Sequence, residues 1–361
     1  MIPEDRLLCA LTRQQFRDED KELVQHLCLG KIRWDRVLVT ARRHGVAPLV
    51  CTNLERLPIT SLGIDEAILA TFRFLQEANR VSKQRQLKQI VEVVSQLKDR
   101  SIDVMVVKGA AMDLAVYDQP WYTTSADADL ILRRHRHELS AQELSEVWPL
   151  LRKHRNLEFD FFQHHDITMN GVLRVDFQRI WNDAVPVRMG GCEVFMMQPE
   201  DMLIAACINS CRKRFFRLKS ITDIRELIIK YPAMDWGKVC ARAHEYNCPS
   251  IIYTALLVSS ITLGHVMPPK VFDAFRVGAF RKSVLQRISN RLGFCAPPSI
   301  DSGFKIFGKT VGLSVVLPYL ASSFPRPGRM LSTFVWELHR THVDEHRSVR
   351  KNEVSDDIVR I

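Results

Sequence analysis

The spacing of apolar residues changes twice along this chain of 361 residues, and no other feature constrains its fold as strongly. Over roughly the first hundred residues, apolar side chains recur every three or four positions, which is typical of helices. From Ser101 they gather in short runs rich in β-branched residues, which favour strands. From Pro199 the helical spacing returns. We therefore expect an α+β fold, in which a small mixed β-sheet is flanked by N-terminal and C-terminal helical regions.

Two segments predict the N-terminal helical region, which we assign to residues 1–100. The first runs from Trp34 to Gly45, where the glycine is typical of a helix end, and Pro48 lies just beyond it. The second runs from about Ile64 to Asp99 and contains neither glycine nor proline. A long helix is therefore expected immediately before the strands.

The middle region, residues 101–198, holds the strand candidates. The first is the run Asp103 to Val107, which ends at Lys108, and the second is Ala128 to Leu132. A C-terminal helical domain is expected over 199–342, followed by a charged tail over 343–361 that can be frayed or disordered. Further strand candidates are Leu157 to Phe162, Asp166 to Met169, Val172 to Phe177 and Cys192 to Met197, with a hairpin turn at Asn170-Gly171 and a helix over Ser140 to Lys153.

Composition excludes several classes of protein. The chain is 46% hydrophobic and 25% charged, which is ordinary for a globular protein and excludes a disordered or collagenous chain. Its longest apolar runs are shorter than the ~20 residues that cross a bilayer, so no membrane span is expected. The nine cysteines are an odd number and include no C-x-x-C pair, which argues against a disulfide framework. We expect a cytoplasmic protein without a secretory signal.

The net charge of +10 favours partners that carry phosphate, namely nucleotides, nucleic acid or an anionic surface. Five of the eight residues from Arg212 to Lys219 are basic. Lys213 and its neighbours could reach a triphosphate. The alternative, which the sequence slightly favours, is a solvated face with Phe215 and Phe216 packed inward.

A pair of carboxylates is the most informative local feature. Asp127 and Asp129 are two apart on a predicted strand, so both side chains point to the same side. Two carboxylates on one side repel each other and are tolerated most easily with a divalent cation between them. Magnesium in that position could also hold a nucleoside triphosphate. A purely structural role for the pair stays open.

Asp176 supplies a possible third carboxylate, since it lies in the strand candidate Val172 to Phe177. If that strand lies beside the one carrying Asp127, three carboxylates meet, as two-metal nucleotidyl transfer requires. The alternative is an exposed polar position on a half-buried strand.

The Lys108-Gly109 pair lies where a strand gives way to a helix, whose free N–H groups attract phosphate. Neither GxxxxGK[ST] nor GxGxxG is present, and neither are G-x-S-x-G and H-E-x-x-H.

These segments together resemble a known family. The stretch from Lys108 to Leu132, KGAAMDLAVYDQP followed by DADLIL, is similar to the pattern K-G-x(~17)-D-x-D of the uncharacterised nucleotidyltransferase family, part of the DNA polymerase beta-like nucleotidyltransferase superfamily. The resemblance extends over about Lys31 to Pro327 and includes LRVDF and a helical segment with Asp223.

The resemblance implies roles for individual residues. Asp127 and Asp129 would bind the metal, and Asp176 would be the third catalytic and metal-binding carboxylate. Lys108, Gly109 and Ser125 would bind the nucleotide. We add Lys213 to this nucleotide-binding set because it lies in the basic segment Arg212 to Lys219. The chain departs from the family pattern at Thr123, Ala126 and Gln178, where arginine, glycine and an aromatic residue or histidine are usual.

The expected function is therefore a magnesium-dependent nucleotidyltransferase, with manganese as a possible substitute. It would move a nucleoside monophosphate from an NTP, with ATP favoured, to an acceptor such as a peptide or small metabolite of a biosynthetic pathway. Two alternatives stay open: a binding protein that keeps this fold without catalysis, and an enzyme that modifies tRNA or another RNA.

Overall fold

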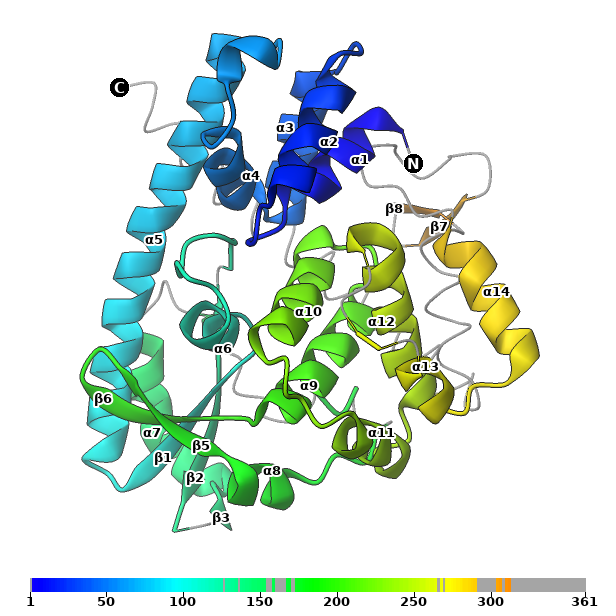
Figure 1. Cartoon of the computed structure of the whole chain (residues 1–361). Helices are drawn as coiled ribbons and strands as arrows, with labels where there is room; N and C mark the ends of the chain where they lie inside the picture. Colours follow the sequence, from blue (N-terminus) through cyan, green and yellow to red (C-terminus); the bar gives the residue numbers. More distant parts are fainter. Residues whose placement is uncertain are drawn as a thin grey trace.

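The computed structural model describes residues 2–125, 127–135, 137–153, 158–159, 167–169, 173–264, 267–268, 270–290, 303–306 and 309–312. Helices come first along the chain, a sheet follows, and helices return, as the periodicity predicts (Figure 1). The expected α+β class, with a small mixed sheet between helical regions, is confirmed. The limits of the four predicted regions stay predictions, and the tail over 343–361 lies outside the described residues.

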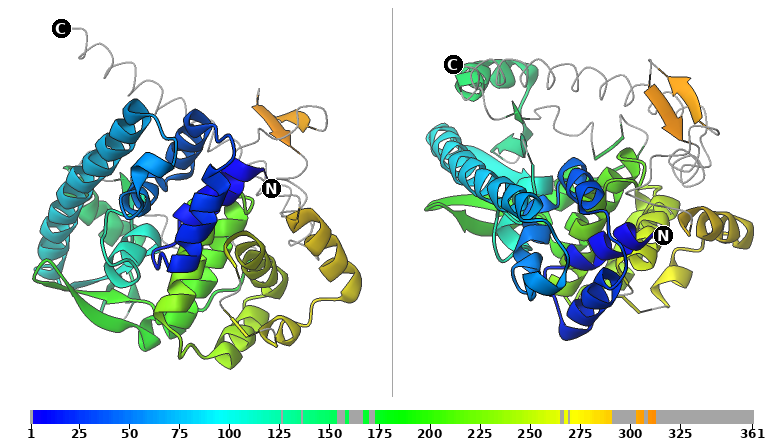
Figure 2. Two further views of the ribbon diagram at one scale, coloured as in Figure 1. Left: turned by 45° about the horizontal axis from the view of Figure 1, so that its top comes forward. Right: turned by 90° about the horizontal axis from the view of Figure 1, so that it is seen from above.

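The N-terminal helices precede one long helix, α5, which spans Glu66–Lys98. At 1.5 Å per residue, its 33 residues extend about 50 Å. Both views in Figure 2 place α5 along one side of the molecule and the C-terminal helix α14 toward the opposite side. The other N-terminal elements are α1 (Pro3–Leu11), α2 (Asp18–Cys28), α3 (Trp34–His44), α4 (Ala47–Leu54) and the short 3-10 helix η1 (Ile59–Ser61).

The sheet has the strand order β3-β2-β1-β6-β5, with β4 paired to β2. Strand β1 lies antiparallel to β2 and parallel to β6, so the sheet is mixed. Helix α5 contacts β1 and β6, whereas α6 contacts β1 and β2. The strands are β1 (Ile102–Val107), β2 (Asp127–Arg134), β3 (His137–Glu138), β4 (Glu158–Phe159), β5 (Val185–Met189) and β6 (Cys192–Met196).

Helices α6 to α8 connect the strands, and α9 to α14 follow the sheet. Helices α9, α10 and α12 contact one another, and α6 contacts α9. A two-stranded hairpin of β7 (Gly303–Ile306) and β8 (Lys309–Gly312) lies beyond α14 in the chain. The helices are α6 (Lys108–Ala115), α7 (Ala141–Lys153), α8 (Phe177–Asp183), α9 (Pro199–Arg212), α10 (Leu218–Lys230), α11 (Trp236–Glu245), α12 (Pro249–Leu263), α13 (Val271–Ala274) and α14 (Ala279–Ser289).

One set of strand predictions is wrong. Residues Ile167 to Met169 form a turn, and Leu173 to Asp176 are irregular, whereas strands were expected there. Phe177 begins helix α8, because Asp176 caps that helix through its side chain. The rest of these segments, including the hairpin turn at Asn170-Gly171, lies outside the described residues.

The buried apolar side chains form one cluster that joins the N-terminal helices, the sheet and the C-terminal helices. It includes Leu7 and Leu8 of α1, Val104 and Met105 of β1, and Leu285 of α14. In the part of the chain that is described, no helix is both long enough and apolar enough to cross a bilayer. This shared core packs the sheet against the N-terminal and C-terminal helices, and the site lies among these elements.

Candidate functional site

The carboxylate pair lies at the edge of the sheet where β1 ends. Strand β2 begins at Asp127, and its antiparallel register places Asp129 opposite Val107, the last residue of β1. Asp129 is only 7% exposed, whereas Asp127 is half-buried. Because the two residues are separated by one position on a strand, their side chains leave the sheet on the same side.

The chain turns sharply from β1 into helix α6 at Lys108. Its φ of 51° lies in the left-handed region, which costs a residue other than glycine about 1 kcal/mol or more. The Lys108 Nζ donates a hydrogen bond of 2.7 Å to Asp129 Oδ1, and both side chains are largely buried. This turn therefore joins the start of α6 to the carboxylate pair.

Gly109 follows the turn and meets Ser125 from the next loop. A Cβ added at Gly109 would lie 3.1 Å from both the Cβ and the Oγ of Ser125. This separation is tighter than most Cβ contacts in proteins, so a side chain at this position would make Ser125 shift by a few tenths of an ångström. Gly109 thus favours a close approach and not an unusual φ. The backbone at the start of α6 and the Ser125 hydroxyl consequently lie next to each other.

A cavity of about 230 Å³ opens at this edge, between the sheet and helices α9 and α10. One face of α9 lines it, and the character of that face changes along the helix from apolar to cationic. The lining residues of α9 are Met202, Ala205, Ala206, Asn209 and Arg212, and Lys213 follows directly. The remaining lining comes from β1 and α6 (Val106, Val107, Lys108, Gly109, Ala111 and Met112), from β2 and the loop before it (Thr124, Ser125, Asp127 and Asp129), from Met197, and from Arg217, Lys219, Ser220 and Asp223 at the start of α10.

The charges around the cavity favour an anionic ligand. Five cationic side chains line it, against three carboxylates, and the N-termini of α6 and α10 both face it. Helix N-termini carry partial positive charge and free N–H groups, which attract phosphate. The cations are Lys108, Arg212, Lys213, Arg217 and Lys219, and the carboxylates are Asp127, Asp129 and Asp223.

Asp223 holds one of these cations in place. Its Oδ2 accepts a hydrogen bond of 2.7 Å from Lys219 Nζ, and its Oδ1 accepts one of 2.7 Å from the Tyr117 hydroxyl. Burial, followed by the nearby Asp223 charge, raises the pKa of Tyr117 well above its ordinary value. Tyr117 therefore stays protonated and keeps donating to Asp223 over the whole physiological pH range.

A comparison with known protein families gives a match, and the matched residues include the whole site. A family model described as "uncharacterised nucleotidyltransferase" matches residues 30–264, which is more than half of the chain. The protein belongs to this nucleotidyltransferase family. No curated protein and no solved structure matched the chain. The match begins one residue before the expected start of the resemblance at Lys31, and it ends well before Pro327.

Most residues expected to form the nucleotidyltransferase site line this one cavity. They come from the β1–α6 turn, from the loop that precedes β2, from β2 itself and from the end of α9. The six are Lys108, Gly109, Ser125, Asp127, Asp129 and Lys213.

Asp176 is not among the residues that line the cavity. It caps helix α8, where its Oδ1 accepts a hydrogen bond of 3.0 Å from the Arg179 backbone amide. The adjacent Arg174 amide bonds to the carbonyl of Tyr246, at the end of α11. Among the described residues, no three acidic, histidine or cysteine side chains converge so that they could hold a metal ion. The expected convergence of Asp176 with the pair is therefore not observed, because this segment caps a helix instead of continuing the sheet.

Several residues of the site carry no signal in the sequence. Helix α5 contributes Asn79, Lys83 and Gln86, each of which bonds to the segment from Trp121 to Asp127. Only the polar character of Lys83 and Gln86, on a helix face that is otherwise apolar, could have indicated them. Tyr117 is likewise placed at the site by the fold alone, whereas Arg217 belongs to the basic segment Arg212 to Lys219 that the sequence indicated.

Proposed function

We propose that this protein is a magnesium-dependent nucleotidyltransferase that moves a nucleoside monophosphate from an NTP, with ATP favoured, to a peptide or small metabolite. The observation that carries the proposal is one cavity that joins the Asp127–Asp129 pair to the start of α6 and to the cations of α9 and α10. Membership of the nucleotidyltransferase family supports transfer of a nucleotidyl group in general.

The residues of this chain would bind and orient the triphosphate. The backbone N–H groups after Lys108 and the hydroxyl of Ser125 lie together because Gly109 has no side chain. The cationic end of the cavity, including Lys213 and Lys219, would neutralise the outer phosphates. The apolar part of the α9 face would then lie against the nucleoside. Fixing both ends of the nucleotide would align the α-phosphorus for attack, which is where most of the catalysis in phosphoryl transfer arises.

The carboxylate pair fits one magnesium ion. Magnesium is usually bound by one or two carboxylates together with substrate phosphates, and it retains several waters. Asp127 and Asp129 line the same cavity and supply such a pair. When bound, the ion would neutralise charge on the phosphate oxygens. Among the residues whose side chains are described, no group of three carboxylate, histidine or cysteine side chains gathers so that it could hold a second ion.

The reaction would break the phosphoanhydride bond between the α- and β-phosphates and form a phosphoester or phosphoramidate bond to the acceptor. An oxygen or nitrogen of the acceptor forms a bond to the α-phosphorus, and the bond from that phosphorus to the oxygen of the β-phosphate breaks. Pyrophosphate leaves with the electron pair of the broken bond, and the acceptor proton passes to water. The cations at the α10 end of the cavity would stabilise the charge that develops on the pyrophosphate.

Two measurements test the proposal. The protein would be titrated with ATP by calorimetry, with and without magnesium. It would then be incubated with magnesium, ATP labelled on the α-phosphorus, and an extract of small molecules and peptides. We expect magnesium-dependent binding of ATP, transfer of label to an extract component, and release of pyrophosphate. Asp127→Asn and Asp129→Asn should each lower transfer by about a hundredfold or more, the loss typical for one charge-stabilising group.

Asp18→Asn is the matched control, because Asp18 belongs to another D-x-D pair but is exposed on α2. It should transfer label like the unmodified protein. Absence of magnesium-dependent ATP binding in the unmodified protein would contradict the proposal. If Asp127→Asn and Asp129→Asn both transfer label as fast as the unmodified protein, the two carboxylates are not needed for the reaction.

A second candidate is a nucleotide-binding protein of the same fold that does not catalyse transfer. This candidate is favoured because Asp176 caps helix α8 and is not among the residues that line the cavity. The two measurements separate the candidates, because this protein would bind ATP and magnesium but release no pyrophosphate.

A further inference from the structure

Helix α5 holds the loop that leads into the carboxylate pair. The Asn79 side-chain amide donates to the backbone carbonyls of Trp121 (2.7 Å) and Thr123 (3.3 Å). The Gln86 side-chain amide donates to the backbone carbonyl of Asp127, at 3.0 Å. The segment from Trp121 to Asp127 is therefore tied to α5 at both of its ends.

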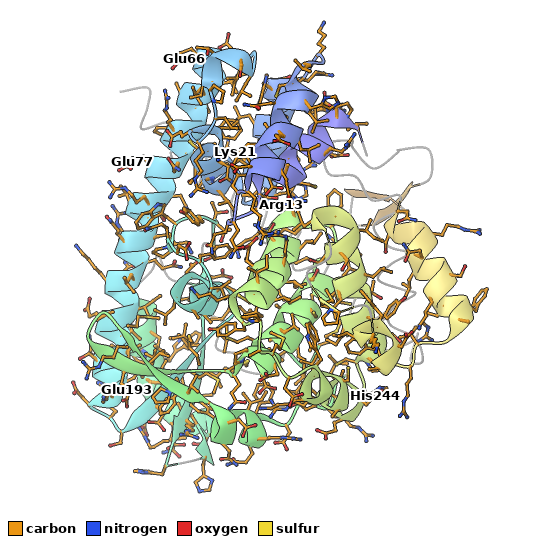
Figure 3. The ribbon with its side chains drawn as sticks, viewed as in Figure 1. Arg13, Lys21, Glu66, Glu77, Glu193 and His244 are labelled. Carbon is orange, nitrogen blue, oxygen red and sulfur yellow. The ribbon has the colours of Figure 1, made fainter. Side chains whose placement is uncertain are left out.

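Lys83 lies between these two contacts and reaches the middle of the same segment. Its Nζ donates a hydrogen bond of 2.6 Å to Ser125 Oγ and forms an ion pair with Asp113 of α6. Asn79, Lys83 and Gln86 follow the spacing i, i+4, i+7, which places them on one side of the helix. Figure 3 shows the labelled Glu66 and Glu77 on the outer side of α5, and both carboxylates are exposed.

The burial of Lys83 requires an explanation, because the side chain is only 5% exposed. Taking an ammonium and a carboxylate out of water costs several kcal/mol per ion before their attraction is counted. Desolvation also dominates at Asp113, whose pKa is raised above the ordinary value despite the adjacent ammonium. An apolar pair would fill the same space at lower cost, but only the ammonium can also donate to Ser125.

Ser125 connects Lys83 to the cavity, because it accepts the hydrogen bond from Lys83 and is itself a lining residue. Its side chain lies against Gly109 at the start of α6. A displacement of Ser125 would change the space over the α6 N-terminus. It would also move Asp127, two residues further along the chain. The position of both depends on the loop being held against α5.

We propose that Lys83 is a positioning residue of this site, which holds Ser125 against the start of α6 through the Nζ–Oγ hydrogen bond. Its effect on nucleotide binding rests on the proposed function, whereas its effect on the loop does not. Lys83 is not among the residues that line the cavity, so it acts through Ser125 and not by touching the nucleotide.

The experiment removes the buried charges together, since Lys83→Met alone would leave the Asp113 carboxylate buried without its partner. The double variant K83M/D113L replaces the ion pair by apolar groups of similar shape. Hydrogen–deuterium exchange of the peptides spanning residues 119–129 is measured without nucleotide, and ATP affinity is measured with magnesium. We expect exchange in this segment to speed up and ATP binding to weaken, each about tenfold, the size of one lost hydrogen bond to a charged group.

Ser125→Ala provides the second arm and keeps the Lys83–Asp113 pair. It should accelerate exchange in the same segment, and adding K83M/D113L to it should produce little further change. Lys88→Met is the control, because Lys88 lies on the exposed side of the same helix. It should change neither exchange nor affinity.

Three results would overturn the proposal. One is unchanged exchange over 119–129 in both K83M/D113L and Ser125→Ala. Another is faster exchange spread evenly over the whole chain, which indicates a merely structural role. The third is full additivity of the two changes, since Lys83 would then act independently of Ser125.

If the unmodified protein binds no ATP, the proposed function fails, and the exchange measurement alone decides the role of Lys83. If K83M/D113L does not fold, Ser125→Ala decides it.

Discussion

Asp127 and Asp129 carry the same charge on the same side of one strand, yet their surroundings differ. The Asp129 carboxylate is largely buried and paired with Lys108. The Asp127 side chain is half-buried, and among the described residues no cation contacts its carboxylate. Removing a charge therefore has different consequences for stability at the two positions, although both are proposed to hold the same metal ion.

We predict that Asp129→Asn lowers the free energy of unfolding by about 2 kcal/mol, because the largely buried Lys108 ammonium loses its charged partner. The Tm should fall by a few degrees. Asp127→Asn, which is the same chemical change two residues away, should leave the Tm within about a degree. Differential scanning fluorimetry without metal or nucleotide measures both values. Equal Tm changes for the two variants would show that the Lys108–Asp129 pair does not stabilise the fold.

At the scale of elements, the end of helix α3 contacts the loop that precedes β2. Gly45 ends α3 with φ 73°, as the sequence predicts for a helix-terminating glycine, and its carbonyl accepts a hydrogen bond from the Thr124 amide. A Cβ at Gly45 would lie only 2.6 Å from Thr124 Oγ1. Because Thr124 lines the cavity, the N-terminal helices contact the candidate site directly.

Gly45→Ala should therefore cost more than a left-handed alanine alone. Gly63 is the matched control, since its φ of 61° is also positive but nothing lies within 4 Å of an added Cβ. We predict that Gly63→Ala loses about 1 kcal/mol from backbone strain. Gly45→Ala should lose clearly more and should also weaken ATP binding, because Thr124 must move. Denaturant unfolding and calorimetry measure the two effects. If Gly45→Ala and Gly63→Ala lose the same stability and ATP affinity is unchanged, Thr124 moves aside without a measurable loss of free energy.

At the scale of the whole molecule, one apolar core joins all the helical regions to the sheet, and it contains buried thiols far apart in the sequence. Burial raises the pKa of Cys51 on α4 to about 12 and that of Cys28 at the end of α2 to about 11. Burial likewise raises the pKa of Cys207 on α9 and of Cys248 before α12. Each of these thiols is consequently neutral at physiological pH.

We predict that Cys51, Cys207 and Cys248 resist alkylation in the folded protein. At pH 8, a thiol of pKa 12 is ionised in about one molecule in ten thousand, and the thiolate is the reactive form. Mass spectrometry after treatment with N-ethylmaleimide should find these three unlabelled in buffer and fully labelled in guanidinium chloride. The half-buried Cys192 should react before these three. Labelling of Cys51 alone at native conditions would show that α4 separates from α5 while the rest of the core stays closed.

Local patterns in the sequence determined much of this protein. The apolar periodicity predicted α3, α5, β1, β2 and β6, because side-chain spacing depends only on the geometry of each element. The same local argument placed Asp127 and Asp129 on one side of a strand, and it placed Lys108-Gly109 at a strand–helix junction. Family resemblance then added Ser125, and the basic segment Arg212 to Lys219 added Lys213. Both residues line the same cavity.

Only the tertiary structure decided which distant segments meet. Alternating residues around Asp176 were consistent with a strand, but the Asp176 side chain bonds to the backbone ahead of it and starts a helix instead. Lys83 looked like one polar residue among many on a long helix, and its burial against Ser125 depends on how α5 crosses the sheet. Periodicity is set by neighbours along the chain. The cap at Asp176 is also a local contact, since it joins that residue to the Arg179 amide, whereas the contact of Lys83 with Ser125 is set by packing between elements more than 40 residues apart.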